Sequence, residues 1–467
     1  MSRVPLPRWV LPVLLGACAA CGKNPVISLE IVTPTGEDTV AGATRLRVRN
    51  ATPATENEIS LVGGAEITLD LSDVTAGGDS TTVTVDALDD AGTVLAHGST
   101  PPFNLLPAES FLRIYVGRTG AVGEAPGALA AGRTDVGLAT MAGLGALIVG
   151  GADASGAPVA VTTVYNEYLH QVAQAADIGA ARAGVTVFEA SDSVVVAFGG
   201  RTAGGVSSLM EVFDPWQGYT GVWVAYSAEG VASLARAFAP AAVLTDGVLC
   251  AGGTDGADAP LASAVTMVAG DAPLATALTS PLAAARAGHT VTPQLDGGAA
   301  LIYGGAVATD APVAERYSPG TQTFTPLDLD AALMRSRHSA TLLGDGRVAI
   351  IGGVDAAGAA RADVIVVAAD GTAALYEAVL QTPRARHTAT LVGGAILVAG
   401  GADDAGTLAD AEVVETTTFT VAGTAPLRGA RAGHAPVLLA SGTVLIAGGV
   451  DGDGAPLARL ELYTPAQ

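Results

Sequence analysis

The chain has 467 residues, of which 49% are hydrophobic and 15% are charged. This composition excludes a disordered tail and allows two or three domains with apolar cores. The 23 basic and 45 acidic residues give a net charge of −22, which makes nucleic acid a poor partner, and we expect none. Aromatic residues are only 4% of the chain, whereas there are 60 glycines and 25 prolines. Such a mixture favours many short elements joined by tight turns.

The N-terminus has the layout of an export signal. Arg3 and Arg8 precede an apolar run that is too short to span a bilayer. The next residues, Leu15-Gly16-Ala17-Cys18, resemble the lipobox of bacterial lipoproteins, in which the cysteine receives a lipid after cleavage. The resemblance implies a signal peptide at residues 1–17, lipidation of Cys18, and a lipid-anchored N-terminus at residues 18–24.

Two alternatives for this segment stay open. An ordinary secretory signal would be cut near Ala20, and Cys21 is a weaker candidate for the lipid acceptor. Ala19, rather than an acidic residue, follows Cys18. By resemblance to lipoproteins of double-membraned bacteria, this implies sorting to the outer membrane. We therefore expect an exported protein that is held at the outer membrane by its lipid, on the periplasmic or the outer face.

Residues 25–107 alternate apolar and polar residues in short runs, as at Leu46 and Val48 and at Val83 and Val85. A period of two is typical of half-buried strands. Clusters of Gly, Asp and Thr interrupt the runs at turn-like intervals. The segment is therefore predicted to be a small β-sandwich that serves as a spacer, and it loosely resembles immunoglobulin-like modules.

A repeated pattern fills the rest of the chain, in which an apolar run ends in Gly-Gly at intervals of about 50 residues. The glycine pairs begin at Gly150, Gly199, Gly252, Gly304, Gly352, Gly400 and Gly448. An arginine stands 16 to 18 residues before each pair, at Arg133, Arg182, Arg236, Arg286, Arg335, Arg384 and Arg431. Four repeats have a histidine three residues after this arginine: His289, His338, His387 and His434.

Further residues of the repeat are an acidic-apolar-aromatic trio, as in Glu461-Leu462-Tyr463, and Trp223. Together with the double glycine, they resemble the kelch repeat. The resemblance covers residues 108–467 and implies an all-β fold, a seven-bladed kelch-like β-propeller that follows the sandwich. Because the last repeat stops at Gln467 without a fourth strand, residues 110–116 are predicted to complete it and close the ring.

The seven repeated arginines are the first candidate for a binding site. Seven guanidinium groups near the propeller axis would form a positive focus suited to carboxylate or phosphate. In eukaryotic kelch domains some arginines at the corresponding position face the channel mouth and hold acidic peptides, which implies a similar role here. The alternative is that a residue present in every repeat serves packing, for example by pairing with the recurring glutamates.

A second candidate is the aromatic pair Trp216 and Tyr219, which falls in a predicted turn and could stack on a sugar ring or a partner surface. Packing against a neighbouring repeat is its alternative. We expect the four histidines to hydrogen-bond between repeats rather than to bind a metal, and the acidic turns after the glycine pairs to be ordinary hairpin turns. No metal site, cofactor or catalytic residue is predicted.

The sequence thus predicts an envelope-anchored lipoprotein whose propeller is a binding scaffold for a protein or glycan ligand. We expect a monomer. The alternative function is an envelope enzyme, an isomerase or oxidase that holds an anionic sugar through the arginines. It is the weaker hypothesis because no Ser-His-Asp, P-loop, zinc or paired-carboxylate pattern occurs at usable spacing.

Overall fold

The computed structural model describes residues 10–14, 26–52, 54–61, 80–104, 110–191, 194–226, 234–268, 274–295, 298–305 and 310–467. The fold is all-β with almost no helix, and it contains many four-stranded antiparallel sheets, as in a propeller-like fold. The described part includes the short 3-10 helix η2, Ala331–Leu333. None of its helices combines the length and apolarity needed to cross a membrane. The predicted lipid acceptor Cys18, with its alternatives at Ala20 and Cys21, lies outside the described residues.

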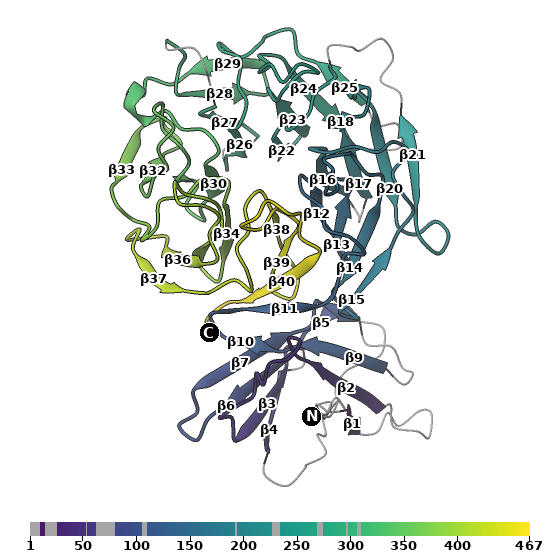
Figure 1. Cartoon of the computed structure of the whole chain (residues 1–467). Helices are drawn as coiled ribbons and strands as arrows, with labels where there is room; N and C mark the ends of the chain where they lie inside the picture. Colours follow the sequence, from purple (N-terminus) through teal and green to yellow (C-terminus); the bar gives the residue numbers. More distant parts are fainter. Residues whose placement is uncertain are drawn as a thin grey trace.

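Two sheets form the N-terminal unit, drawn in purple and blue below the ring in Figure 1. One sheet consists of β1 (Val10–Leu14), β2 (Val26–Val32) and β9 (Ser110–Tyr115), and the other of β10 (Gly117–Arg118), β7 (Val94–Ser99), β6 (Val83–Leu88), β3 (Arg45–Asn50) and β4 (Thr55–Ser60). A short pair, β5 (Ser80–Thr81) and β8 (Phe103–Asn104), accompanies them. Buried residues of both sheets, among them Leu29, Val85 and Ile114, pack into one apolar cluster.

The N-terminal unit extends further along the chain than the predicted boundary at residue 107. Strand β9 pairs in parallel with β2, and β10 pairs with β7, so residues up to Arg118 belong to this unit. Ile114 and Val116 are fully buried in its core. The apolar surface of β9 therefore completes the N-terminal unit.

The remaining sheets are four-stranded and antiparallel. In chain order of their first full strand they are β12 (Gly137–Met141), β13 (Gly145–Val149), β14 (Thr162–Asn166), β15 (Gln171–Gln174); β16 (Thr186–Ser191), β17 (Val194–Phe198), β20 (Met210–Asp214), β21 (Val222–Tyr226); β22 (Ala241–Leu244), β23 (Gly247–Ala251), β24 (Ala264–Val268), β25 (Leu274–Ala277); β26 (Thr290–Pro293), β27 (Ala300–Tyr303), β28 (Ala314–Ser318), β29 (Thr323–Pro326); β30 (Ser339–Leu342), β31 (Val348–Ile351), β32 (Val364–Val367), β33 (Ala373–Tyr376); β34 (Thr388–Val392), β35 (Ala395–Ala399), β36 (Ala411–Glu415), β37 (Val421–Thr424); and β38 (Ala435–Leu438), β39 (Val444–Ala447), β40 (Arg459–Thr464) with β11 (Ala121–Ala128). The hairpin β18 (Arg201–Thr202) and β19 (Gly205–Val206) lies between β17 and β20 in the chain and forms a separate two-stranded sheet.

These sheets are arranged in a ring around a common axis (Figure 1). The first strand of each sheet is innermost, and neighbouring inner strands contact one another, as β12 contacts β16 and β26 contacts β30. Apolar side chains of adjacent sheets pack into shared clusters. One such cluster joins Leu249 and Ala251 of one sheet to Ile302 of the next. The core therefore lies between the sheets, because a single sheet cannot bury both of its faces.

The ring closes with a strand other than the predicted one. Strand β11, Ala121–Ala128, pairs antiparallel with β40 and is the outer strand of the last sheet. The predicted closing segment, residues 110–116, instead pairs with β2. The prediction was wrong because the more apolar segment is needed to cover the N-terminal core. Pro126 and the irregular register of β11 are tolerated at a sheet edge, where an N–H donor is dispensable.

Each double glycine marks a close approach between adjacent sheets. A Cβ atom on Gly400 would lie 2.4 Å from the carbonyl oxygen of Arg431 and 3.0 Å from the ring of His434, both in the next sheet. Gly400 also has a φ of 56°, which L side chains rarely adopt. The glycine pair is therefore required by packing between sheets and says nothing by itself about a ligand.

Gly400→Ala tests this requirement against Gly358→Ala as the matched control. Gly358 has a φ of 83° but nothing within 4 Å of its added Cβ. We expect Gly358→Ala to lower the free energy of unfolding by about 1 kcal/mol, the cost of the backbone conformation alone. Gly400→Ala should cost at least about 3 kcal/mol, since steric overlap is added. Urea unfolding measures both, and equal losses would contradict the close approach.

Candidate functional site: the axial rim

The seven repeated arginines are buried, with 4% or less of each residue exposed. In six of them the guanidinium Nη1 donates a hydrogen bond to the carbonyl of the first glycine of the pair in its own sheet, for example from Arg182 to Gly199 at 3.0 Å and from Arg384 to Gly400 at 2.9 Å. Arg335 donates to Asp363 instead, at 2.8 Å. These six arginines therefore tie the start of an inner strand to the end of the second strand.

Acidic side chains of the third strand complete these contacts. Arg286 donates to Glu315 from both Nε and Nη2, at 3.1 and 3.0 Å, and both side chains are fully buried. Arg182, Arg384 and Arg431 pair with Glu211, Glu412 and Glu461 through Nη2 alone. Burial lowers the pKa of Arg286, and the nearby Glu315 partly opposes this.

The prediction of an arginine ring that captures a ligand does not match this geometry. Burial and internal hydrogen bonds leave the guanidinium groups of Arg133, Arg182, Arg236, Arg286, Arg335, Arg384 and Arg431 facing protein atoms. The other interpretation, pairing with the recurring glutamates, describes the contacts of four of them, Arg182, Arg286, Arg384 and Arg431.

A different set of residues surrounds the axis at the end where the inner strands begin. Each member lies two residues after a repeated arginine, and we call the set the axial rim: Asp135, Gly184, Phe238, Gly288, Arg337, Arg386 and Gly433. The backbone N–H of a rim residue donates to the carbonyl of the rim residue in the preceding sheet. The structure has five of these bonds, from Gly184 to Asp135, Phe238 to Gly184, Arg337 to Gly288, Arg386 to Arg337 and Gly433 to Arg386, at 2.7 to 2.9 Å.

All seven rim residues have a positive φ, between 52° and 65°. Glycine adopts this conformation without cost, whereas Asp135, Phe238, Arg337 and Arg386 adopt it at a cost of order 1–3 kcal/mol each. The hydrogen bonds between sheets hold them in it. Non-glycine residues in such a conformation are a reason to consider function at this position.

The rim side chains lie over their glycine neighbours. A Cβ atom on Gly184 would lie 2.5 Å from the ring of Phe238, and one on Gly433 would lie 2.9 Å from Nη2 of Arg386. The side chain of Arg337 lies over Gly288 in the same way, at 3.4 Å. Three glycines thus give room to three large side chains around one axis.

Arg337 and Arg386 are exposed, and the described residues give neither of them an ion pair. Asp135 is half-buried, and burial raises its pKa, while the charges of Arg386 and Arg201 act in the opposite direction. Arg201, on β18, lies with its guanidinium 5.8 Å from the centre of the Phe238 ring and pairs with Asp258. The axial rim therefore carries a local excess of positive charge in a chain of net charge −22.

The four repeat histidines are buried and join neighbouring sheets. His338, His387 and His434 hydrogen-bond through Nε2 to hydroxyl groups of the preceding sheet, at 2.8 to 3.0 Å, and His289 to the carbonyl of Ala251 at 2.8 Å. Burial lowers the pKa of His289 to about 4 and those of His338 and His387 to about 3. Within the described ranges, no group of three or more His, Cys, Asp or Glu side chains is placed to hold a metal ion.

The acidic turns are held by their own aspartates. Asp355 Oδ1 accepts from the backbone N–H groups of Ala357 and Ala359 at 2.9 and 3.0 Å, and Asp451 accepts in the same way from Asp453 and Ala455. These oxygens are therefore occupied by turn hydrogen bonds.

Trp216 and Tyr219 lie in the turn between β20 and β21 and are strongly exposed, at 65% and 109%. The rim residue Gly184 lies just before β16. Because β16, β17, β20 and β21 are antiparallel in this order, the turn between β20 and β21 lies at the end of the ring opposite to the axial rim. Trp223, by contrast, packs on Phe213 and donates to the carbonyl of Ala176 at 3.0 Å, in the adjacent sheet. The structure therefore does not bring the predicted aromatic pair and the predicted arginines together.

Sequence reasoning missed Arg337 and Arg386. It looked for the residue that all repeats share, whereas the rim position is Asp, Gly, Phe, Gly, Arg, Arg and Gly in successive repeats. The available signal was the R-x-R-H pattern at Arg335–His338 and Arg384–His387, in which a second arginine follows the repeated one.

Comparison with known proteins gives little about activity. No protein-family model matches the sequence, and no curated protein matches it. A solved structure described as "Structure of YjhT" is similar to this chain with a TM-score of 0.47 and 15% sequence identity. The similarity covers 60% of this chain and 94% of that one.

Proposed function

We propose that the protein is a cell-envelope lipoprotein whose ring of sheets, a seven-bladed kelch-like propeller, binds an anionic protein segment or glycan at the axial rim. The observation that supports this most is the pair Arg337 and Arg386, which are exposed and without an ion pair among the described residues. Arginine side chains bind carboxylates and phosphates through paired hydrogen bonds. In this proposal the repeated arginines stabilise the sheets and do not bind the ligand.

The surroundings of the two arginines favour a ligand that offers both negative charge and an apolar face. Phe238 is 41% exposed on the same rim, and the guanidinium of Arg201 lies over it. An exposed aromatic ring beside cationic groups suits a carboxylated sugar ring or an acidic segment with an aliphatic side chain. The strongly acidic rest of the chain would repel an anion, so the rim would also direct where it binds.

The anchoring part of the proposal rests on the sequence at Leu15-Gly16-Ala17-Cys18. In the mature protein Cys18 would carry the lipid, and β1 would be removed with the signal peptide. The remaining strands of the N-terminal unit would hold the ring away from the membrane. Mass spectrometry of the mature N-terminus tests this. An acylated Cys18 supports the anchor, and an unmodified cysteine or a cut elsewhere would refute it.

Arg337→Gln with Arg386→Gln tests the binding site. The variant should lose about 10- to 100-fold in affinity for oligogalacturonate or for a hexaglutamate peptide, because two hydrogen bonds between charged groups are removed. Calorimetric titration of the Cys18→Ala protein measures this, and wild-type affinity should fall as salt is raised.

The matched control is Arg347→Gln, which removes a partly exposed arginine that pairs with Asp345 in the turn between β30 and β31. It should leave the affinity within about twofold. Equal affinity of the rim variant and the control for a ligand that binds the wild type would place that ligand elsewhere. The turn of Trp216 and Tyr219 would then be the next candidate.

A further inference from the structure

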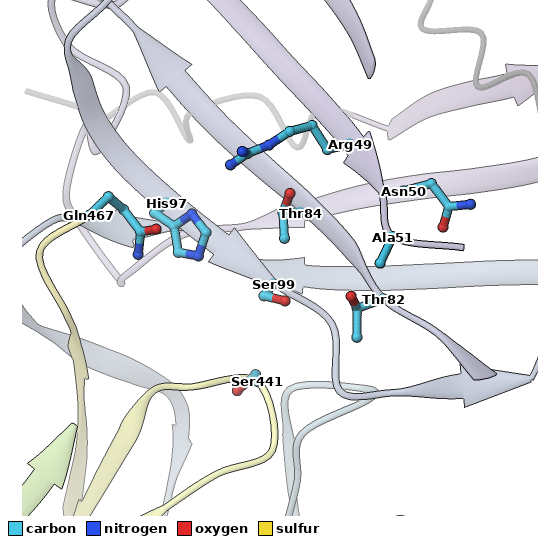
Figure 2. A pocket seen from close by; sticks show the side chains of 9 residues that line it. All are labelled: Arg49, Asn50, Ala51, Thr82, Thr84, His97, Ser99, Ser441 and Gln467. Carbon is cyan, nitrogen blue, oxygen red and sulfur yellow. The ribbon is translucent and has the colours of Figure 1, made fainter. Parts of the chain in front are cut away.

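A polar pocket lies where the N-terminal unit meets the last sheet of the ring. Its described lining comes from β3, β6 and β7 on one side, and from Ser441 and Gln467 on the other (Figure 2). The residues that carry its chemistry are Arg49, Thr82, Thr84, His97, Ser99 and Ser441. They supply one guanidinium, one imidazole and four hydroxyl groups.

The register of the strands places these groups on one face of the sheet. Arg49 lies opposite Thr84, which lies opposite Ser99, and Asp86 lies opposite His97 one row away. Val48 directly precedes Arg49, and Val85 lies between Thr84 and Asp86. Both valines point to the other face of the sheet and are fully buried in the core. The alternation that builds the apolar core thus also sets a row of polar side chains along the pocket.

Asp86 holds the guanidinium of Arg49 and the imidazole of His97 in place. Its side chain is 1% exposed, and its two oxygens accept from Arg49 Nη2 at 2.6 Å and contact His97 Nδ1 at 2.7 Å. Burial alone would raise the pKa of Asp86, but the hydrogen bond to His97 and the charge of Arg49 outweigh it and lower the pKa. Asp86 is therefore a carboxylate that fixes the orientation of both side chains.

The pocket retains free donors. Arg49 Nε is buried and has no hydrogen-bond partner, and the Arg49 side chain as a whole is 42% exposed. With Nδ1 held by Asp86, His97 has Nε2 left for a ligand. No acidic side chain is among the described residues that line the pocket. An unmet donor, an oriented imidazole and several hydroxyls are the groups that bind an oxyanion.

We infer that this pocket binds a tetrahedral oxyanion, the phosphate or sulfate group of a small molecule, between Arg49 and His97. The hydroxyls of Thr82 and Thr84 supply further hydrogen bonds from the N-terminal unit, and that of Ser441 supplies one from the ring. The Ser99 hydroxyl already donates to the carbonyl of Thr100 at 3.1 Å. Because Ser441 belongs to the turn between β38 and β39, the ligand links the N-terminal unit to the last sheet. Binding should therefore raise the melting temperature of the whole chain.

The charge around His97 comes from neighbouring strands of the N-terminal unit. The charged groups near His97 are Asp86 on β6 and Arg49 and Arg47 on β3. Gly117 lies opposite His97 on β10, and Ser441 and Gln467 are neutral side chains on the ring side. Sulfate is the suitable probe, since its own charge is constant near neutral pH.

Calorimetric titration of the whole chain with sodium sulfate and with inorganic phosphate tests the site. We expect saturable binding of both. A sugar phosphate that binds more tightly than inorganic phosphate would identify an ester as the ligand, and equal affinity would identify the free ion. Absence of saturable binding up to about 10 mM would overturn the proposal.

Arg49→Gln should weaken sulfate binding at least about tenfold. Arg47→Gln is the matched control, because Arg47 lies on the same face of β3 but pairs with Glu58 at 3.1 Å outside the pocket. It should change the affinity less than about twofold. If Arg49→Gln fails to fold, Thr84→Val and Ser441→Ala should each weaken binding in its place. Equal effects of Arg47→Gln and Arg49→Gln would contradict a site at the pocket.

Discussion

Arg286→Met is expected to lower the free energy of unfolding by about 3–5 kcal/mol, because it leaves a carboxylate buried without its cation. Glu315 would keep a hydrogen bond from the backbone N–H of Ala283 at 2.8 Å, but it would lose both bonds from Arg286. The carbonyls of Gly304 and Pro312 would lose their donors as well. Urea unfolding followed by circular dichroism measures the loss through the midpoint of the transition.

Two controls separate this explanation from a general effect of mutation. Adding Glu315→Leu to Arg286→Met should recover part of the lost stability, since the uncompensated charge is then removed. Arg347→Gln, at an exposed pair, should stay within about 0.5 kcal/mol of the wild type. If Arg286→Met were as stable as the wild type and lost ligand binding, the repeated arginines would be binding residues after all.

Acid is expected to destabilise the protein steeply between about pH 6.5 and pH 4, through its buried histidines. Burial lowers the pKa of His170 and His289 to about 4 and those of His338 and His387 to about 3, and holds that of His434 well below its usual range. A histidine whose pKa is lower in the folded state takes up its proton only in the unfolded state within this window. The unfolded state therefore gains stability as pH falls, by up to about 1.4 kcal/mol per pH unit for each such group.

The chain itself supplies the control for this prediction. The three repeats without histidine have Val136, Val185 or Ala239 at the equivalent position. Val136 packs against Gly448 as His434 packs against Gly400. His387→Val with His434→Val should therefore keep the fold and lower the slope of stability against pH. Urea midpoints at pH 7.5, 6.5, 5.5 and 4.5 measure the slope. An unchanged slope would show that other groups cause the acid sensitivity.

The repeat architecture could be predicted from the sequence because its cause is local and recurs. The glycine pair, the arginine before it and the acidic residue after it occupy equivalent places, and they contact one another within a sheet, as Arg431 contacts Gly448 and Glu461. The closing strand could not be predicted in this way. Ser110–Tyr115 and Ala121–Ala128 both fit an outer strand, and the choice depends on which segment the N-terminal core requires.

The axial rim was beyond sequence reasoning for a related physical reason. Its members are joined by backbone hydrogen bonds between sheets, and the backbone does not constrain side-chain type, so the position varies from Asp135 to Phe238 to Arg337. A residue that recurs in every repeat is easier to recognise in a sequence. Here the repeated arginine recurs because it forms hydrogen bonds within its own sheet. In this ring the position that varies is the one with exposed charge.

Labelling of arginines with phenylglyoxal in the folded protein, followed by peptide mass spectrometry, tests most directly whether exposed and repeated arginines have different roles. Arg337 and Arg386 should react fast, and oligogalacturonate or hexaglutamate should protect them. The repeated arginines, such as Arg286 and Arg431 with 0% of their surface exposed, should react only after unfolding. Fast labelling of the repeated arginines in the native protein, with protection by an anionic ligand, would contradict the account.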